Sequence, residues 1–297
     1  MLTGTHVAFI GGDARQIEVI KKCSELDATI SLIGFSQLQS EFPGAKKESL
    51  TLEVFKDIDA LILPIVGTNE EGEVESIFSD QPIKIKEEHI RALPQKCVVY
   101  TGIAKPYLTN LTEQNDITLV QLLDRDDVAI YNSIPTVEGA IMMAIQHTNI
   151  TLHHSNAIVL GLGRVGMSLA RTLHVLGARV KVGARNPADL ARIYEMGLTP
   201  FHMNELKEQV GDCDYLFNTV PHLLVTSQVI ASMPGHIFIL DLASKPGGVD
   251  FRFAERRGIK AMLVPSIPGI VAPKTAGMIL ANVVTQLILE QKQTRGA

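Results

Sequence analysis

The amino-acid sequence predicts an α/β protein with two doubly wound parallel sheets, and three observations favour this fold class. Its 297 residues are too many for one small core and fit two domains of ordinary size. Short apolar runs alternate with helical stretches along the chain, which is the pattern of βαβ units. A glycine-bearing turn follows the first apolar run of each half, in VAFIGGDARQ (Val7–Gln16) and in AIVLGLGRVG (Ala157–Gly166).

The apolar runs are predicted to be the strands of two consecutive sheets. In the first half they are His6–Ile10, Thr29–Gly34, Ala60–Leu63, Cys97–Thr101 and Ile117–Leu122. In the second half they are Ala157–Gly161, Arg179–Val182, Tyr215–Asn218, Ile237–Leu240 and Ala261–Val264. Helices are expected between the strands, for example at Gln16–Leu26 and Lys86–Ala92. The acidic segment Pro64–Asp80 is interpreted as a loop over a cleft.

Two helical stretches outside the sheets set the predicted domain boundaries. Ile134–Ile150 lies between the two sheets and has Pro135 where a first helical turn would be. Pro273–Gln291 follows the last strand and is expected to pack back across the connecting helix, so that the chain crosses between the domains twice and the domains are joined by crossing helices. We therefore predict an N-terminal α/β substrate-side domain at 1–133, a connecting helix at 134–152, a nucleotide-binding domain at 153–272 and a C-terminal helix at 273–297.

Composition and charge argue against several classes of protein. The net charge of −5 leaves no basic surplus for binding nucleic acid. No signal peptide is expected ahead of the first strand, and the apolar helix Ala276–Lys292 is interrupted by polar residues and too short to span a bilayer. The three cysteines are isolated in sequence, which indicates reduced thiols. We expect a cytoplasmic protein with no nucleic-acid or membrane partner and no metal site.

The second glycine turn is the stronger candidate for binding a nucleotide. It is a complete G-x-G-x-x-G between an apolar strand and an amphipathic helix, as in Rossmann-like domains. Its first glycine permits the tight turn, the second lets a pyrophosphate approach the backbone, and the third lets helix and strand pack closely. The helix N-terminus adds free N–H groups and a positive dipole end. The turn predicted to bind the dinucleotide consists of Gly161, Leu162, Gly163, Arg164, Val165 and Gly166.

The first glycine turn lacks the third glycine, and Asp13 would put a negative charge where phosphates should lie. Gly11 and Gly12 are therefore interpreted as shaping the other wall of the interdomain cleft. Asp13 is expected to cap the following helix. Arg15 is either an anchor for a substrate carboxylate or a solvated helix residue.

The second strand of the nucleotide-binding half indicates which dinucleotide is bound. An NAD site would usually have an acidic residue near its end. Here Arg185 stands 19 positions after Gly166, with Asn186 beside it. A guanidinium can grip a 2′-phosphate bidentately and stack on adenine. We therefore predict NADP rather than NAD, bound in part by Ala184, Arg185 and Asn186.

Further strand ends should complete the cofactor pocket, because ligands bind outside the carboxyl ends of parallel strands. These ends are the segments Asn218–His222, Asp241–Gly248 and Val264–Gly277. The further cofactor contacts predicted from them are Thr219, Val220, Pro221, Asp241, Ala243, Pro268 and Gly269.

Several motifs together resemble the A subunits of bacterial dipicolinate synthases, the sporulation enzymes that make pyridine-2,6-dicarboxylate. They are residues 9–16, Arg125–Ile141, Gly161–Arg171, Lys181–Asn186, Ile239–Gly248 and Pro268–Gly277, and they extend over nearly the whole chain. The nucleotide-binding half also resembles methylene-tetrahydrofolate and shikimate dehydrogenases and, more distantly, D-2-hydroxyacid dehydrogenases. It departs from the last group because PSIPG contains no histidine at their acid–base position.

The resemblance implies NADP-dependent oxidation of dihydrodipicolinate, formed from 4-hydroxy-tetrahydrodipicolinate of the lysine pathway, to dipicolinate during sporulation. It also implies that the partner is a flavoprotein-like B subunit, in the mother-cell cytoplasm, and we expect a homo-oligomer. A substrate with two carboxylates requires cationic or hydroxyl donors. The predicted substrate-binding residues are Asn132, Ser133, Thr136, Thr101 and Gly102. The predicted catalytic residues are His222, as proton acceptor, with Lys274 and Thr275.

Two other functions stay open because the chain lacks an evident acid–base constellation. The first is a non-catalytic component whose NADPH binding controls a partner enzyme. The second is a stand-alone NADP-dependent dehydrogenase of another cyclic or keto acid.

Overall fold

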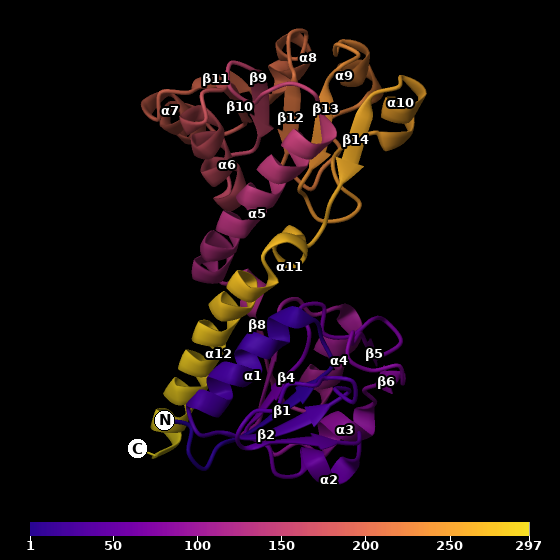
Figure 1. Ribbon diagram of the computed structural model, residues 1–297, viewed down its shortest axis with the longest axis vertical. Coiled ribbons are helices and arrows are strands. Elements are labelled where there is room, and N and C mark those ends of the chain that lie inside the picture. Colours follow the sequence, from indigo (N-terminus) through magenta and orange to yellow (C-terminus); the bar gives the residue numbers. More distant parts are fainter. Residues whose placement is uncertain (297) are drawn as a thin grey trace. The chain divides into compact units, whose positions relative to one another are not determined.

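The computed structural model describes residues 1–296 and divides into two compact units. Unit 1 comprises Met1–Tyr131 together with the C-terminal segment from Ala272, and unit 2 comprises Asn132–Val271. Each unit contains one six-stranded parallel sheet, so the predicted α/β class with two doubly wound sheets is confirmed (Figure 1).

Unit 1 is built on a sheet with the strand order β3-β2-β1-β4-β7-β8, and β5 and β6 form a separate short antiparallel pair. Its strands are β1 (His6–Ile10), β2 (Thr29–Ile33), β3 (Ala45–Glu48), β4 (Ala60–Ile62), β5 (Glu73–Val74), β6 (Ile83–Lys84), β7 (Val98–Thr101) and β8 (Thr118–Gln121). Its helices are α1 (Ala14–Glu25), α2 (Leu52–Phe55), α3 (Glu87–Arg91), α4 (Pro106–Gln114), the 3-10 turn η1 (Leu122–Asp124), the start of α5 (Asp126–His147) and α12 (Pro273–Gly296).

Alternating side chains of β1 bury both faces of this sheet. Val7 and Phe9 join the core beneath α1 and α12, whereas Ala8 and Ile10 join the core beneath α2, α3 and α4. Both faces are covered, as continuous apolar strands of a parallel sheet require. Figure 1 shows α12 alongside α1, and Gly277 permits the approach because a Cβ there would lie 2.5 Å from the carbonyl oxygen of Arg15.

Unit 2 repeats the same order with the strands β11-β10-β9-β12-β13-β14. Its strands are β9 (Asn156–Leu160), β10 (Arg179–Ala184), β11 (Thr199–His202), β12 (Tyr215–Asn218), β13 (Phe238–Asp241) and β14 (Lys260–Leu263). Its helices are the remainder of α5, α6 (Arg164–Val175), α7 (Pro187–Glu195), η2 (Met203–Glu205), α8 (Leu206–Gln209), α9 (Ser227–Ala231), α10 (Phe251–Arg256) and α11 (Ile267–Val271). Ala157 and Val159 of β9 pack in the core that contains α5 and α6, and Ile158 and Leu160 pack in the core that contains α9 and α10.

The expected connecting helix begins earlier than predicted. The interpretation that Pro135 lies in a first turn is wrong: α5 begins at Asp126, and Pro135 lies inside it. Asp126 and Asp127 stand in the true first turn, where acidic side chains favour the helix dipole. Asp127 also accepts a hydrogen bond from the backbone N–H of Val128 at 2.9 Å.

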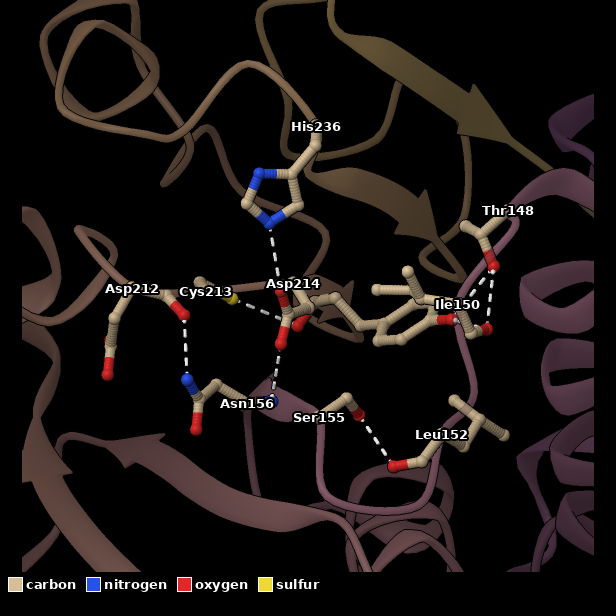
Figure 2. A network of polar contacts seen from close by, with 10 residues as sticks. Thr148, Ile150, Leu152, Ser155, Asn156, Asp212, Cys213, Asp214 and His236 are labelled. Atoms are coloured by element: carbon tan, nitrogen blue, oxygen red, sulfur yellow. Dashed lines mark hydrogen bonds and ion pairs between the residues drawn. The ribbon is translucent and has the colours of Figure 1, made fainter.

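A polar network links the amino ends of the strands of unit 2 (Figure 2). The glycine turn follows the opposite, carboxyl end of β9. The Asp214 carboxylate accepts the backbone N–H of Asn156 at 2.8 Å and contacts His236 Nε2 at 2.8 Å, which links the starts of β9, β12 and β13. The Tyr215 hydroxyl lies 2.8 Å from the Thr148 hydroxyl and donates to the carbonyl of Ile150 at 2.9 Å. These contacts anchor the segment between α5 and β9 and so fix where the first strand begins.

One helix of the described residues, Asp126–His147, is long and apolar enough to cross a membrane by length and composition. Its buried residues Val137, Ala140 and Ala144 belong to the hydrophobic core of unit 2. The apolar composition of α5 is therefore accounted for in part by packing within the fold.

Candidate functional site

The G-x-G-x-x-G turn connects β9 to α6 with the geometry that a pyrophosphate requires. Gly161 has a φ of +96°, and a Cβ there would lie 2.7 Å from Thr219 Oγ1. A Cβ on Gly166 would overlap the carbonyl oxygen of Gly161, so only glycine permits this close packing of strand and helix. Around Gly163, by contrast, a Cβ would meet no atom within 4 Å.

The space beside Gly163 is next to the free end of a helix. Gly163 is the N-cap of the twelve-residue helix α6 and supplies no side-chain hydrogen bond to it. The first-turn N–H groups of α6 can therefore bind an anion that approaches the glycine backbone. Leu162 and Val165 are half-buried beside the turn, and Arg164 is exposed. The residues of this turn fit a dinucleotide.

The neighbouring strand β12 ends against the glycine turn. The Thr219 hydroxyl donates to the carbonyl of Leu160 at 2.8 Å, which ties this strand end to the end of β9. Val220 donates its backbone N–H to Asn218 Oδ1 at 3.1 Å. Pro221 and His222 follow and are exposed. The carboxyl end of the sheet therefore carries both the glycine turn and the predicted contacts Thr219, Val220 and Pro221.

Asp241 and Asn218 form a buried pair that sequence reasoning did not recognise. Both side chains are 0% exposed, and Asn218 Nδ2 donates to Asp241 Oδ1 at 2.8 Å. Asp241 also accepts the backbone N–H groups of Ala243 at 3.0 Å and Gly248 at 2.6 Å. The Asp241 carboxylate is thus bonded to the loop that follows β13, and the pair orders the segments after β12 and β13.

The end of β10 presents Arg185 to solvent. Ala184 is buried, whereas Arg185 and Asn186 are exposed. Asn186 caps α7 by accepting the backbone N–H of Ala188 at 2.9 Å. Among the side chains that the structure describes, the Arg185 guanidinium has no hydrogen-bond or ion-pair partner, so it is available to an anionic ligand.

Three predicted substrate residues lie inside α5 and not at a helix start. Ser133 is 1% exposed, and its hydroxyl lies 3.0 Å from that of Ser168. The Thr136 hydroxyl donates to the carbonyl of Asn132 at 2.8 Å. The expected anion site formed by the N-terminus of this helix with Asn132, Ser133 and Thr136 is therefore wrong, because the helix starts two turns earlier, at an acidic end.

The predicted catalytic pair Lys274 and Thr275 stands where the second helix was expected to start. α12 begins at Pro273, and both side chains are exposed in its first turn, in unit 1. Pro268 and Gly269 belong to the short helix α11 of unit 2, where Pro268 is buried.

Thr101 and Gly102 brace a loop of unit 1. The Thr101 hydroxyl donates to the carbonyl of Pro64 at 2.7 Å, and the side chain is 1% exposed. A Cβ on Gly102 would lie 2.6 Å from the carbonyl oxygen of Ile65. These two residues support the loop after β4, and the Thr101 hydroxyl is already used as a donor within it.

The first glycine turn of the chain ends in a cap, as expected. Asp13 accepts the backbone N–H of Arg15 at 3.0 Å, and it also holds the Arg15 guanidinium through Nε at 3.0 Å and Nη2 at 2.5 Å. Burial raises the pKa of Asp13, but hydrogen bonds and the charge of Arg15 outweigh this effect, so the pKa is lowered from its ordinary value. Arg15 is thus neither solvated nor free.

A cavity of about 580 Å³ opens beside this cap, at the carboxyl ends of β1 and β4. Its lining includes Asp13, Arg15, Thr68, Glu75 and Lys105. Thr68 and Lys105 were missed from the sequence, although Thr68 lies in the segment interpreted as a loop over a cleft. Nothing in the sequence distinguishes this threonine from other loop hydroxyls.

Comparisons with known proteins agree with this architecture. Residues 6–123 match the family model for the N-terminal domain of the dipicolinate synthase A subunit. Residues 129–297 match the alanine dehydrogenase/PNT C-terminal domain, an NAD(P)-binding family. The transhydrogenase of Sinorhizobium meliloti shares the fold, with a TM-score of 0.65 at 18% identity over 96% of this chain and 94% of that one.

Two relatives are much more similar. The dipicolinate synthase A subunit of Bacillus subtilis (strain 168) is 54% identical over 296 residues, which cover 100% of both chains. The crystal structure of the dipicolinate synthase A subunit from Bacillus halodurans has a TM-score of 0.94 and 57% identity, over 97% of this chain and 99% of that one. The chain therefore belongs to the family of dipicolinate synthase A subunits.

Proposed function

We propose that the chain oxidises dihydrodipicolinate to dipicolinate with NADP, in partnership with a B subunit. The observation that carries the proposal is the open space over Gly163 at the uncapped N-terminus of α6, in a chain of this family. The relatives are named as one subunit of a synthase, which supports a second, partner protein. The resemblance noted above makes that partner flavoprotein-like.

Unit 2 would hold the cofactor through residues that follow the carboxyl ends of β9, β10 and β12. The turn Gly161–Gly166 would receive the pyrophosphate, and Arg185 the 2′-phosphate. Thr219 and Val220 would follow the ribose of the nicotinamide half. When bound, NADP supplies a hydride acceptor.

The reaction needs little beyond this acceptor. Dihydrodipicolinate loses a hydride to NADP and a proton to a base, and the ring becomes aromatic. The protein must therefore orient the ring and receive one proton. We assign the proton to His222, whose imidazole is exposed at the carboxyl end of β12. Lys274 and Thr275 are proposed as donors to the substrate.

The activity test is direct. Purified chain should reduce NADP when it is supplied with 4-hydroxy-tetrahydrodipicolinate, which gives dihydrodipicolinate by loss of one water molecule. The reduction is measured by nicotinamide absorbance with and without the B subunit. Reduction that requires the B subunit would still support the proposal if His222→Ala in this chain lowers the rate. Turnover that proceeds unchanged with His222→Ala would remove the assigned base, and no turnover under either condition would contradict the proposed oxidation.

The choice of cofactor is tested by substituting Arg185. Arg185→Asp should weaken NADPH binding by roughly 10–100-fold, the equivalent of about 1.5–3 kcal/mol for a lost charged hydrogen bond. NADH binding should be retained or improved, because a carboxylate accepts the ribose hydroxyls. Arg179, exposed at the other end of β10, provides the matched control. Calorimetry that shows equal NADPH and NADH affinities in the unsubstituted chain would contradict the assignment.

A further inference from the structure

The cavity of unit 1 lies where its sheet reverses strand order. In the order β3-β2-β1-β4-β7-β8, the chain leaves β1 toward one edge and returns to β4 on the other side. The residues after β1 and after β4 line the cavity together. Ligands of doubly wound sheets bind at this crevice, and 580 Å³ is within the usual range for small-molecule sites.

Thr68 is an unpartnered polar group in the wall of this cavity. Its side chain is 1% exposed, and among the buried side chains that the structure describes its hydroxyl alone has no hydrogen-bond partner. A buried hydroxyl without a partner is costly and therefore unusual. A ligand in the cavity would supply the missing acceptor or donor.

The loop that carries Thr68 is held rigidly on both sides. Gly67 donates its backbone N–H to the carbonyl of Pro64 at 3.0 Å, and Asn69 donates to the carbonyl of Glu73 at 2.9 Å. From the next strand end, Ile103 donates to the carbonyl of Ile65 at 2.6 Å. The hydroxyl therefore cannot find a partner by a small loop movement without breaking these bonds.

The half-buried charges around the cavity favour an anion. Lys105 is half-buried, and its ammonium has no partner within the part of the chain that the structure describes. Arg15, whose side chain is 12% exposed, is held by Asp13, so these three groups together carry one net positive charge. Lys105 is also the N-cap of the nine-residue helix α4, whose N-terminus adds positive potential.

The other carboxylates of the lining are exposed. Glu73 is bonded to Asn69 at 2.8 Å, Asp80 accepts a hydrogen bond from Gln37, and Glu75 is open to solvent. Hydrated charges act weakly compared with half-buried ones, because water and salt screen them. Among the buried and half-buried polar side chains of the cavity, those that lack a protein partner in the described structure are thus a cation and a hydroxyl, which both donate to an oxyanion.

We propose that this cavity binds a carboxylate of the substrate, with Thr68 and Lys105 as its donors. The proposal rests on the proposed function, which supplies a heterocycle with two carboxylates. It assigns this carboxylate to two residues of unit 1 that were not predicted from the sequence, and it gives Thr101 and Gly102 the role of bracing the Thr68 loop.

The test is calorimetric titration of the full chain with dipicolinate, the reaction product, and separately with NADPH. Thr68→Val and Lys105→Gln should each weaken dipicolinate binding about 10-fold or more, since each removes a donor to a charged acceptor, while NADPH affinity stays unchanged. Thr112→Val and Lys46→Gln are matched controls: Thr112 is buried with its hydroxyl bonded to Leu108, and Lys46 is exposed on β3.

A second readout separates binding from a structural role. Thr68→Val should raise the melting temperature of the unliganded chain, because it removes an unpartnered buried hydroxyl at constant shape. A threonine that merely stabilised the loop would lower it. Pyridine-2,6-dicarboxamide, which has the same shape without charge, should not bind.

The outcomes distinguish this inference from the proposed function. Dipicolinate binding that is unchanged in both variants would overturn the site and leave the function standing. Equal binding of the diamide would overturn the carboxylate assignment. If the unsubstituted chain binds NADPH but not dipicolinate, both the site and the proposed substrate are wrong.

Discussion

At the scale of single residues, the three glycines of the cofactor turn have different reasons for being glycine. Gly161 needs its positive φ, and Gly166 lies against the backbone of Gly161. Gly163 has an ordinary φ of −74° and open space where a Cβ would lie. The fold itself therefore does not require glycine at position 163, whereas the proposed pyrophosphate would occupy the place of a Cβ there.

This difference gives a paired prediction. Gly163→Ala should leave the melting temperature unchanged but abolish measurable NADPH binding, because the added methyl group occupies the pyrophosphate's place. Gly166→Ala should instead destabilise the fold by about 1–3 kcal/mol or more, since the methyl group forces strand and helix apart. Gly235→Ala, another open position, is the control for both. Normal NADPH binding by a folded Gly163→Ala variant, seen by calorimetry, would show that this turn is not the phosphate site.

At the scale of elements, the sequence predicts the central strands of both six-stranded sheets and the edge strands β8 and β14, but misses the opposite edge strands β3 and β11. β1 is predicted to the residue, because its apolar run is buried on both faces. β3 was missed: it reads Ala-Lys-Lys-Glu and lies largely exposed at the sheet edge, so it carries no apolar pattern. β11 was missed at the equivalent edge of unit 2, where Pro200 interrupts a short run.

The features of the candidate sites divide into those that consecutive residues indicate and those that depend on residues distant in sequence. The glycine turn is a local pattern, and its strand-turn-helix context is readable from consecutive residues. The start of α5 was misplaced because Pro135 resembles a first-turn proline, whereas the true start depends on acidic residues nine positions earlier. The buried pair Asn218–Asp241 and the cavity at Thr68 bring together residues distant in sequence, so no local pattern indicates them.

The cap of α1 leads to a prediction about pH. Because the pKa of Asp13 is lowered in the folded chain, its ion pair stabilises the fold above the ordinary value of 3.8, and this stability is lost as the pH falls through the folded pKa. Asp13→Asn keeps a capping side chain but removes the charge. The variant should be less stable by about 0.2–1 kcal/mol at neutral pH, because the carboxylate is 39% exposed, and equal to the unsubstituted chain at acidic pH. Urea unfolding at several pH values measures this, and a difference that persists unchanged below pH 3.8 would contradict it.

At the scale of the whole molecule, the chain is two sheets of the same topology with separate cores. Each hydrophobic cluster contains residues of one unit alone: two clusters lie in unit 1 and two in unit 2. Each unit also has its own candidate ligand region at the reversal of strand order, the Thr68 cavity in unit 1 and the glycine turn in unit 2. NADPH should therefore stabilise the hydrophobic cores of unit 2, and dipicolinate those of unit 1.

Hydrogen exchange can test this separation. NADPH at 100 times its dissociation constant should stabilise unit 2 by about 2.7 kcal/mol, which slows exchange through its unfolding about 100-fold. The slowed amides should be those of β9 and β12, whereas β1 and β4 should exchange at unchanged rates because their cores contain no residue of unit 2. Dipicolinate should give the reverse pattern and protect the loop Gly67–Asn69. Equal protection of all four strands by NADPH alone would show that the two cores unfold as one, and the separate clusters would then not define independent units.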